Sequence, residues 1–177
     1  MQSPIFRRLA VAVFLAAAAV QGAAAQESSN RVGANTDWSV FEETDPKQCW
    51  AVSSPKETVN TRDGRVVAVR RGDILLFVSY LPSEGVEGQV SFTGGYPFAE
   101  GSTVTMEIGG SVFELFTEGE MAWAASPEED ERIVERMKRG ADAILTGLSS
   151  RGTTTKDTFS LYGFTASVEE AEARCAD

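Results

Sequence analysis

The stretch from Arg65 to Leu81, RVVAVRRGDILLFVSYL, places the strongest constraint on the fold. Residues 66–69 and 74–78 are apolar at nearly every position, which is typical of strands that are buried on both faces. A polar link, RRGD at positions 70–73, joins the two runs and is short enough for a tight antiparallel connection. The pattern therefore predicts a hairpin in the middle of a sheet.

Alternating apolar and polar residues predict further short strands. Residues 103–108 alternate cleanly, and Gly109-Gly110 is a two-residue turn into a partner strand over 111–116. The other strands are expected at 38–41, 49–52, 90–92, 121–124, 143–148 and 158–162. Residues 54–64 are expected to form a loop that ends in an Asp-Gly turn.

Capping signals predict two helices. Ser126, Pro127 and Glu129 form a capping box ahead of an apolar stripe, and Gly140 follows the expected end of this helix. Ser167 and Glu170 have the same spacing and predict a short helix that ends at Cys175. The predicted fold is mainly β: an antiparallel β-sandwich with one or two short helices packed against it.

The first 25 residues have the pattern of a secretory signal peptide. Arg7 and Arg8 precede an apolar run over 9–20, and three alanines offer a cleavage site after Ala25. This run is shorter than the roughly 20 residues that cross a bilayer, so we expect no transmembrane segment after cleavage. The predicted location is the periplasm, with association with the cell surface left open. Residues 26–36 are expected to be a flexible leader, and residues 37–177 a single domain.

Composition excludes several classes of function. Removal of residues 1–25 takes away two of the 16 basic residues and none of the 26 acidic ones, so the net charge changes from −10 to −12. Such a charge repels phosphate backbones and anionic lipids, and we expect no nucleic-acid partner. The chain has no histidine, which excludes Ser-His-Asp and Cys-His catalysis. We therefore predict no catalytic residues, no cofactor and no metal site.

Two cysteines, Cys49 and Cys175, lie far apart in the expected mature chain. An even count in an exported protein favours a disulfide between them, which would attach the last helix to an early strand. The alternative is two buried free thiols, because cysteine is often buried without bonding.

Two further groups of residues are candidates for binding. A glycine-rich loop over 94–101 carries Tyr96 and Phe98, which either form an exposed binding lip or cover the open end of the sandwich. Four arginines near the predicted central hairpin either gather as an anion site or lie at solvated strand ends: Arg62, Arg65, Arg70 and Arg71.

Three short motifs, in this order, resemble those of the invasion-associated locus B family of exported α-proteobacterial proteins. They are DWSV at 37–40, PKQCWA at 46–51 and FSLYGF at 159–164, the last followed by a short amphipathic helix. Many members carry a cysteine soon after the first motif, where this chain has Phe41 and Glu42, and another after a glycine where this chain has Glu120. This chain thus has a reduced set of cysteines.

The resemblance implies a small periplasmic or envelope protein, associated in some pathogens with host-cell invasion, and it implies no catalytic residues. We therefore expect a non-enzymatic protein that acts through contacts with a protein partner in the envelope. The alternative is a small-ligand or glycan-binding β-sandwich that uses the loop with Tyr96 and Phe98.

Overall fold

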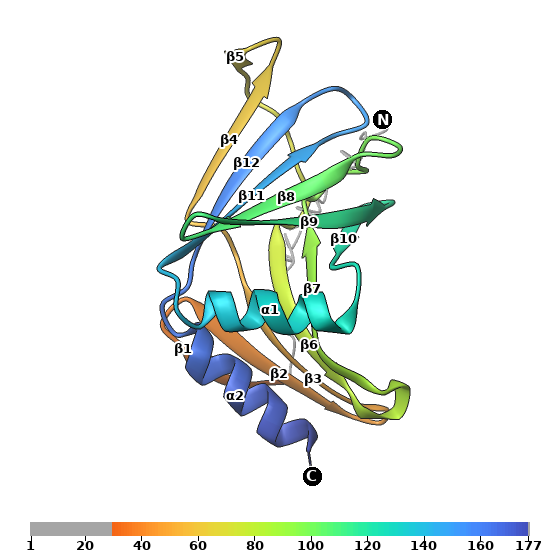
Figure 1. Cartoon of the computed structure of the whole chain (residues 1–177), viewed down its shortest axis with the longest axis vertical. Coiled ribbons are helices and arrows are strands. Elements are labelled where there is room, and N and C mark those ends of the chain that lie inside the picture. The colour runs from red at the N-terminus through yellow and green to blue at the C-terminus, as the bar shows by residue number, and fades with distance from the viewer. Residues whose placement is uncertain (1–29, 177) are drawn as a thin grey trace, which may run out of the picture.

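The computed structural model describes residues 30–176 as one curved sheet with two helices on one side (Figure 1). Twelve antiparallel strands follow the order β1-β2-β3-β6-β7-β10-β9-β8-β11-β12-β4-β5. Their bounds are β1 Arg31–Asn35, β2 Trp38–Thr44, β3 Lys47–Ser53, β4 Glu57–Arg62, β5 Arg65–Val66, β6 Leu75–Leu81, β7 Val86–Thr93, β8 Thr103–Ile108, β9 Ser111–Glu118, β10 Met121–Trp123, β11 Asp142–Leu148 and β12 Thr154–Ser160. The helices are α1 Pro127–Met137 and α2 Phe164–Cys175, with a 3-10 turn at Pro82–Glu84. The predicted mainly β class is confirmed.

The sheet curls so that its inner face encloses the core. Phe92 of β7 meets Phe159 of β12 edge to face at 6.1 Å, although four strands separate β7 and β12 in the sheet. The buried indole of Trp38 on β2 donates a hydrogen bond to the carbonyl oxygen of Ser160, 2.9 Å away. The two layers of the expected sandwich are therefore two parts of one continuous sheet.

The central hairpin predicted over 65–81 is wrong. β6 is central, as expected, but its neighbours are β3 and β7. Of the first apolar run only Val66 belongs to a strand: it closes the two-residue β5 at the sheet edge and is 77% exposed. An apolar run with β-branched residues favours a strand wherever it lies, so the pattern did not distinguish an edge from the centre.

Two other segments are more ordered than expected. The loop predicted over 54–64 contains β4, which pairs with β12 from Thr61 opposite Thr154 to Glu57 opposite Thr158. In the expected leader, residues 31–35 form β1, which pairs with β2, so the ordered part begins before Asp37. These strands are held by backbone hydrogen bonds and carry few apolar side chains, which removes the alternation signal. The predicted signal peptide and residues 26–29 lie outside the described residues.

Helix α1 has the predicted N-terminus and lies against β7. The hydroxyl of Ser126 accepts a hydrogen bond from the Glu129 backbone N–H at 3.3 Å, and Ile133 and Met137 are buried. The carboxylate of Asp130 accepts a hydrogen bond from the Val90 backbone N–H at 2.7 Å, which attaches the helix to the sheet.

Helix α2 begins three residues before Ser167, so the predicted capping box there is wrong. Its cap is Gly163, at φ 88°, where the carbonyl oxygen of Asn35 would lie 1.9 Å from an added Cβ. Ser167 is buried inside the helix, and its hydroxyl oxygen accepts a hydrogen bond from the Asn35 side-chain amide at 3.1 Å. The start of α2 is thus set by a close approach to β1 that only glycine allows.

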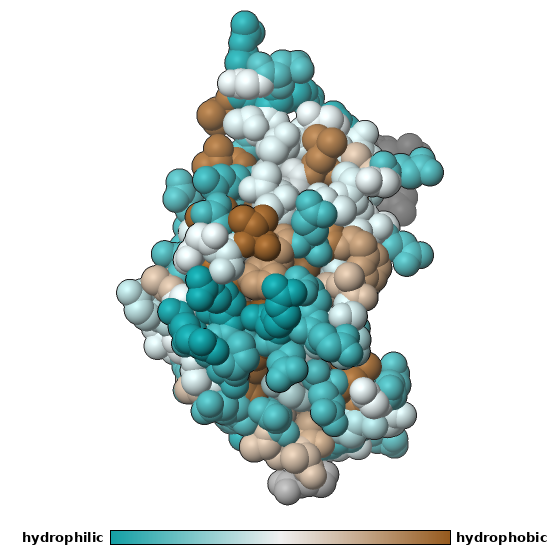
Figure 2. Space-filling view, viewed as in Figure 1, coloured by the Kyte–Doolittle hydropathy of each residue, from teal (hydrophilic) through white to brown (hydrophobic). Residues whose placement is uncertain are grey.

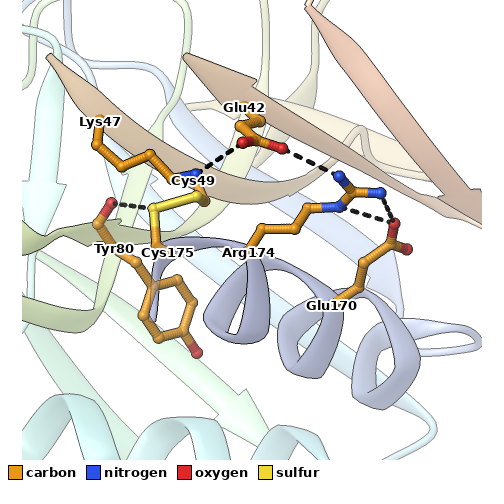
Figure 3. Close-up of a disulfide and its surroundings, with 7 residues drawn as sticks. All are labelled: Glu42, Lys47, Cys49, Tyr80, Glu170, Arg174 and Cys175. Atoms are coloured by element: carbon orange, nitrogen blue, oxygen red, sulfur yellow. Dashed lines mark hydrogen bonds and ion pairs between the residues drawn. A yellow bond between two sulfur atoms is a disulfide. The ribbon is translucent and has the colours of Figure 1, made fainter. Parts of the chain in front are cut away.

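The predicted disulfide is confirmed: Cys49 of β3 is bonded to Cys175 at the end of α2. Beside it, Arg174 of α2 pairs with Glu42 of β2 at 3.0 Å and with Glu170 at 2.9 Å, and Lys47 reaches the same Glu42 at 2.8 Å (Figure 3). One covalent bond and a small charge network therefore hold α2 on the inner face of the sheet.

Candidate functional site: an uncharged aromatic band

Along the adjacent strands β3, β6 and β10, and in β7 from Gln89 onward, the outer face of the sheet carries no charged side chain. Strand alternation turns Cys49, Leu76, Val90 and Ala122 inward, where they are buried, and turns their neighbours outward. Apart from the start of β7, where the register is irregular and the charged residue Glu87 lies, the outward positions of these strands hold only uncharged residues: Gln48, Trp50, Val52, Leu75, Phe77, Ser79, Leu81, Gln89, Ser91, Thr93, Met121 and Trp123. Since charged residues make up 24% of the chain, this face has an unusual composition.

Five aromatic side chains cross this face from β2 to β9: Phe41, Trp50, Phe77, Trp123 and Phe116. We call them the aromatic band. Phe41 stacks on Trp50 with ring centroids 5.5 Å apart, and Phe116 stacks on Trp123 at 5.5 Å. Between the two pairs, the strand register places Phe77 opposite Val52 on β3 and opposite Ser91 on β7. Ser91 in turn lies opposite Trp123, so the register continues the band across the sheet.

The aromatic band is open to solvent. Phe116 is 47% exposed, and the other four rings are partly exposed. Two hollows, of about 540 and 320 Å³, adjoin Trp50 and Phe77. The side of the molecule that carries the helices is different, because hydrophilic side chains gather there over α1 (Figure 2). The band is thus a surface with core-like composition that no described residue covers.

The predicted binding loop does not present two exposed aromatics. Phe98 is only 7% exposed and packs against Phe92 at 6.2 Å and Tyr96 at 5.1 Å. Tyr96 is partly buried, and its hydroxyl shares a 2.5 Å hydrogen bond with that of Thr155. Burial raises the pKa of the Tyr96 phenol. Phe98 therefore belongs to the core, while Tyr96 lines a separate pocket together with Arg62, Arg70 and Arg71.

Sequence analysis missed the aromatic band, although part of its signal was visible. The run LLFVSYL is apolar on both faces, and we interpreted this pattern as a strand buried on both faces. The inner residues are indeed core, but Leu75 and Phe77 face outward and are partly exposed. The whole band can be recognised only when it is known that β3, β6, β7 and β10 are neighbours in the sheet. The alternation of apolar and polar residues does not give this information.

Within residues 30–176, neither helix has the length and apolar character needed to cross a membrane. Comparison with curated proteins and with solved structures found no match. A family model described as "Invasion associated locus B (IalB) protein" matches residues 38–172, from the first residue of β2 into α2. The match spans all five residues of the aromatic band and overlaps both the early DWSV and the late FSLYGF motifs. The chain therefore belongs to the invasion associated locus B family.

Proposed function

We propose that this chain is an exported envelope protein without enzymatic activity, which acts by binding a partner protein through the aromatic band. The observation that carries the proposal is the run of partly exposed aromatic side chains whose neighbouring outward positions on β3, β6 and β10 are uncharged. Burying apolar surface contributes about 25 cal/mol per Å², so covering this face would stabilise a complex. Exposed patches of this kind mark interaction sites.

The composition of the band fits the centre of a protein interface. Interface cores are depleted in charged residues and enriched in aromatic residues and methionine, and the outer face has Met121 beside Trp123. Ser79, Ser91 and Gln89 provide hydrogen-bonding groups between the rings. We therefore infer a partner surface that is mainly apolar and offers a few uncharged hydrogen-bonding groups.

Charged side chains lie at both ends of the band. At the β9 end, Glu114 and Glu118 flank Phe116 on the same face. At the β2 end, Glu43 follows Phe41, and Arg31 of β1 lies opposite Phe41. The rim is therefore acidic at the β9 end and of mixed charge at the β2 end, and a complementary partner carries basic residues where it meets β9. Such rim charges affect the rate of association and its salt dependence more than the affinity.

Export and the lack of catalysis rest on other observations. The disulfide between Cys49 and Cys175 fits an oxidising compartment such as the periplasm. The N-terminal pattern with its cleavage site after Ala25 supports the same route. Lack of histidine removes the commonest general base at neutral pH. We expect the purified protein to show no activity in a broad panel of hydrolase assays. Turnover of any substrate would contradict this part of the proposal.

Site-specific photo-cross-linking in intact cells tests the binding surface. A photoreactive phenylalanine analogue replaces Phe77 in the band or, as the control, Arg132 on the exposed side of α1. We expect one discrete cross-linked protein from position 77 and none of that mass from position 132. The same product from both positions, or no product from position 77, would contradict the proposal.

A second comparison uses the identified and purified partner. Trp50→Ser removes a central ring, whereas Val66→Ser removes an exposed apolar side chain at the distant sheet edge. Because a few central aromatic residues dominate most interfaces, we expect Trp50→Ser to weaken binding by roughly 30-fold or more. Val66→Ser should leave the dissociation constant unchanged, and equal effects of the two variants would argue against the band.

A further inference from the structure

The pocket that Tyr96 lines lies where β4, the segment over 67–74, the loop over 94–101 and the β11–β12 turn meet. Its volume is about 410 Å³, within the range of small-ligand sites. Four arginines line it, Arg62, Arg70, Arg71 and Arg151, against a single carboxylate from Glu120. A basic pocket is unexpected in a chain with a net charge of −10.

Arg71 builds the wall of this pocket. Its guanidinium is nearly buried and forms two hydrogen bonds to the carboxylate of Asp157, at 2.7 and 2.5 Å. It also donates to the carbonyl oxygen of Gly94 at 2.8 Å and to the side-chain oxygen of Asn60 at 3.3 Å. The charge of Arg71 is thus balanced, and its donors fix the segment over 67–74 against three other parts of the chain.

A close backbone contact completes the wall. The N–H of Gly72 donates to the carbonyl oxygen of Gly95 at 2.8 Å. Gly95 has φ 70°, and a Cβ at this position would lie 2.6 Å from the carbonyl oxygen of Gly72. Only glycine fits there, so the loop that presents Tyr96 is held in one conformation.

The other three arginines have no carboxylate partner among residues 30–176. Arg62, Arg70 and Arg151 are exposed, and none of them forms an ion pair in this part of the chain. Arg62 donates a hydrogen bond to the hydroxyl of Thr153 at 2.7 Å, which holds its guanidinium at the pocket. Three positive charges therefore line a concave site whose wall is rigid.

We propose that this pocket binds a small oxyanion, a ligand that carries phosphate or carboxylate groups. The guanidinium group presents N–H donors in a planar fork that matches both kinds of oxyanion. The hydroxyl groups of Ser149 and Ser150, which also line the pocket, can donate to the same oxygens. This site is separate from the aromatic band and adds a ligand-binding activity to the protein contacts proposed above.

Calorimetric titration of the purified protein with inorganic phosphate, pyrophosphate and citrate, at low and constant ionic strength, tests the site. We expect saturable binding of at least one probe. A preference for pyrophosphate assigns a phosphate-bearing ligand, and a preference for citrate assigns a carboxylate-bearing one. No saturable binding of any of the three probes would overturn the proposal.

Two double variants with the same change in net charge separate the pocket from general electrostatics. Arg70→Gln with Arg151→Gln removes two pocket arginines, while Arg132→Gln with Arg139→Gln removes two exposed arginines on and just beyond α1. Because hydrogen bonds to charged groups are strong, the pocket variant should lose about tenfold or more in affinity. Equal losses in both variants would overturn the proposal.

The proposed function and this inference fail separately. Trp50→Ser lies in the aromatic band and not in the arginine pocket, so it should weaken partner binding and leave anion binding unchanged. Anion binding that disappears with Trp50→Ser, while the protein remains folded, would place the anion elsewhere and overturn the assignment.

Discussion

The two ends of the curved sheet are closed by different interactions. At the end formed by β1, β2 and β3, α2 covers the inner face, the Cys49–Cys175 disulfide attaches it, and the ring of Trp38 packs against that of Phe164 at 4.9 Å. At the other end, β4 and β5 have no buried residue and extend away from both helices (Figure 1). There the buried ion pair between Arg71 and Asp157 joins the edge segment to β12.

This difference shows how one sheet can combine an end that is closed by apolar packing with an end that is closed by polar interactions. Apolar packing and a covalent bond close the inner face of the α2 end. A buried ion pair loses much of its attraction to the cost of desolvation, so it positions the chain more than it stabilises it. Burial raises the pKa of Asp157, and the Arg71 guanidinium opposes that shift. The polar closure is what leaves the neighbouring arginines facing a pocket.

The largest expected effect comes from removing the disulfide. Cys49→Ala with Cys175→Ala opens a closure that spans 126 residues, and the chain-entropy account then predicts a loss of roughly 4 to 5 kcal/mol in the free energy of unfolding. Urea unfolding followed by tryptophan fluorescence measures this loss. Reduction of the unchanged protein is the matched control and should give a similar loss. A change below about 1 kcal/mol would mean that packing alone holds α2, which would break the comparison.

The next effect concerns the ion pair at the opposite end. Arg71→Leu leaves the carboxylate of Asp157 buried without its partner, and we expect a loss of roughly 3 to 5 kcal/mol in the free energy of unfolding. Arg71→Leu combined with Asp157→Leu should recover most of that loss, because no buried charge remains. Denaturant unfolding of the two single variants and the double variant forms the required cycle. Equal losses in the single and double variants would show that the pair stabilises the edge as much as it positions it.

The same contrast explains how much of the fold was predictable from sequence. At the α2 end, apolar alternation and the cysteines indicated β2, β3 and the disulfide, although β1 and the start of α2 were missed. Elsewhere the cap at Ser126 indicated α1. At the β4 end, residues such as Thr58 and Asn60 are in a strand only because β12 offers backbone partners. Such pairing joins residues about a hundred positions apart, and local patterns contain no information about it.

The candidate sites follow the same rule. Each residue of the aromatic band is visible in the sequence, but its neighbours are set by the register of five strand pairs. Sequence analysis grouped Arg62, Arg65, Arg70 and Arg71, of which Arg65 does not line the pocket. Arg151 joins the other three only through the β11–β12 turn. Conversely, Phe98 has the sequence context of a binding residue and is part of the core. Long-range pairing therefore decides which aromatic and charged residues are available to bind.

The smallest expected effect is a pH dependence of the stability that the charge network at the α2 end contributes. Hydrogen bonds from Lys47 and Arg174 lower the pKa of Glu42 in the folded protein. A carboxyl group whose pKa is lowered by folding adds stability above its unfolded pKa, and this contribution is lost as the pH falls through the folded pKa. Glu42→Gln should therefore lower the melting temperature at about pH 7 and make less difference at about pH 3. Glu107→Gln, on an exposed site of β8, is the matched control. Because Glu42 is in contact with solvent, screening keeps the effect small. A difference between Glu42→Gln and the unchanged protein that persists at acid pH would show that the Glu42 side chain stabilises α2 through packing, and its charge would then have no part in the closure of that end.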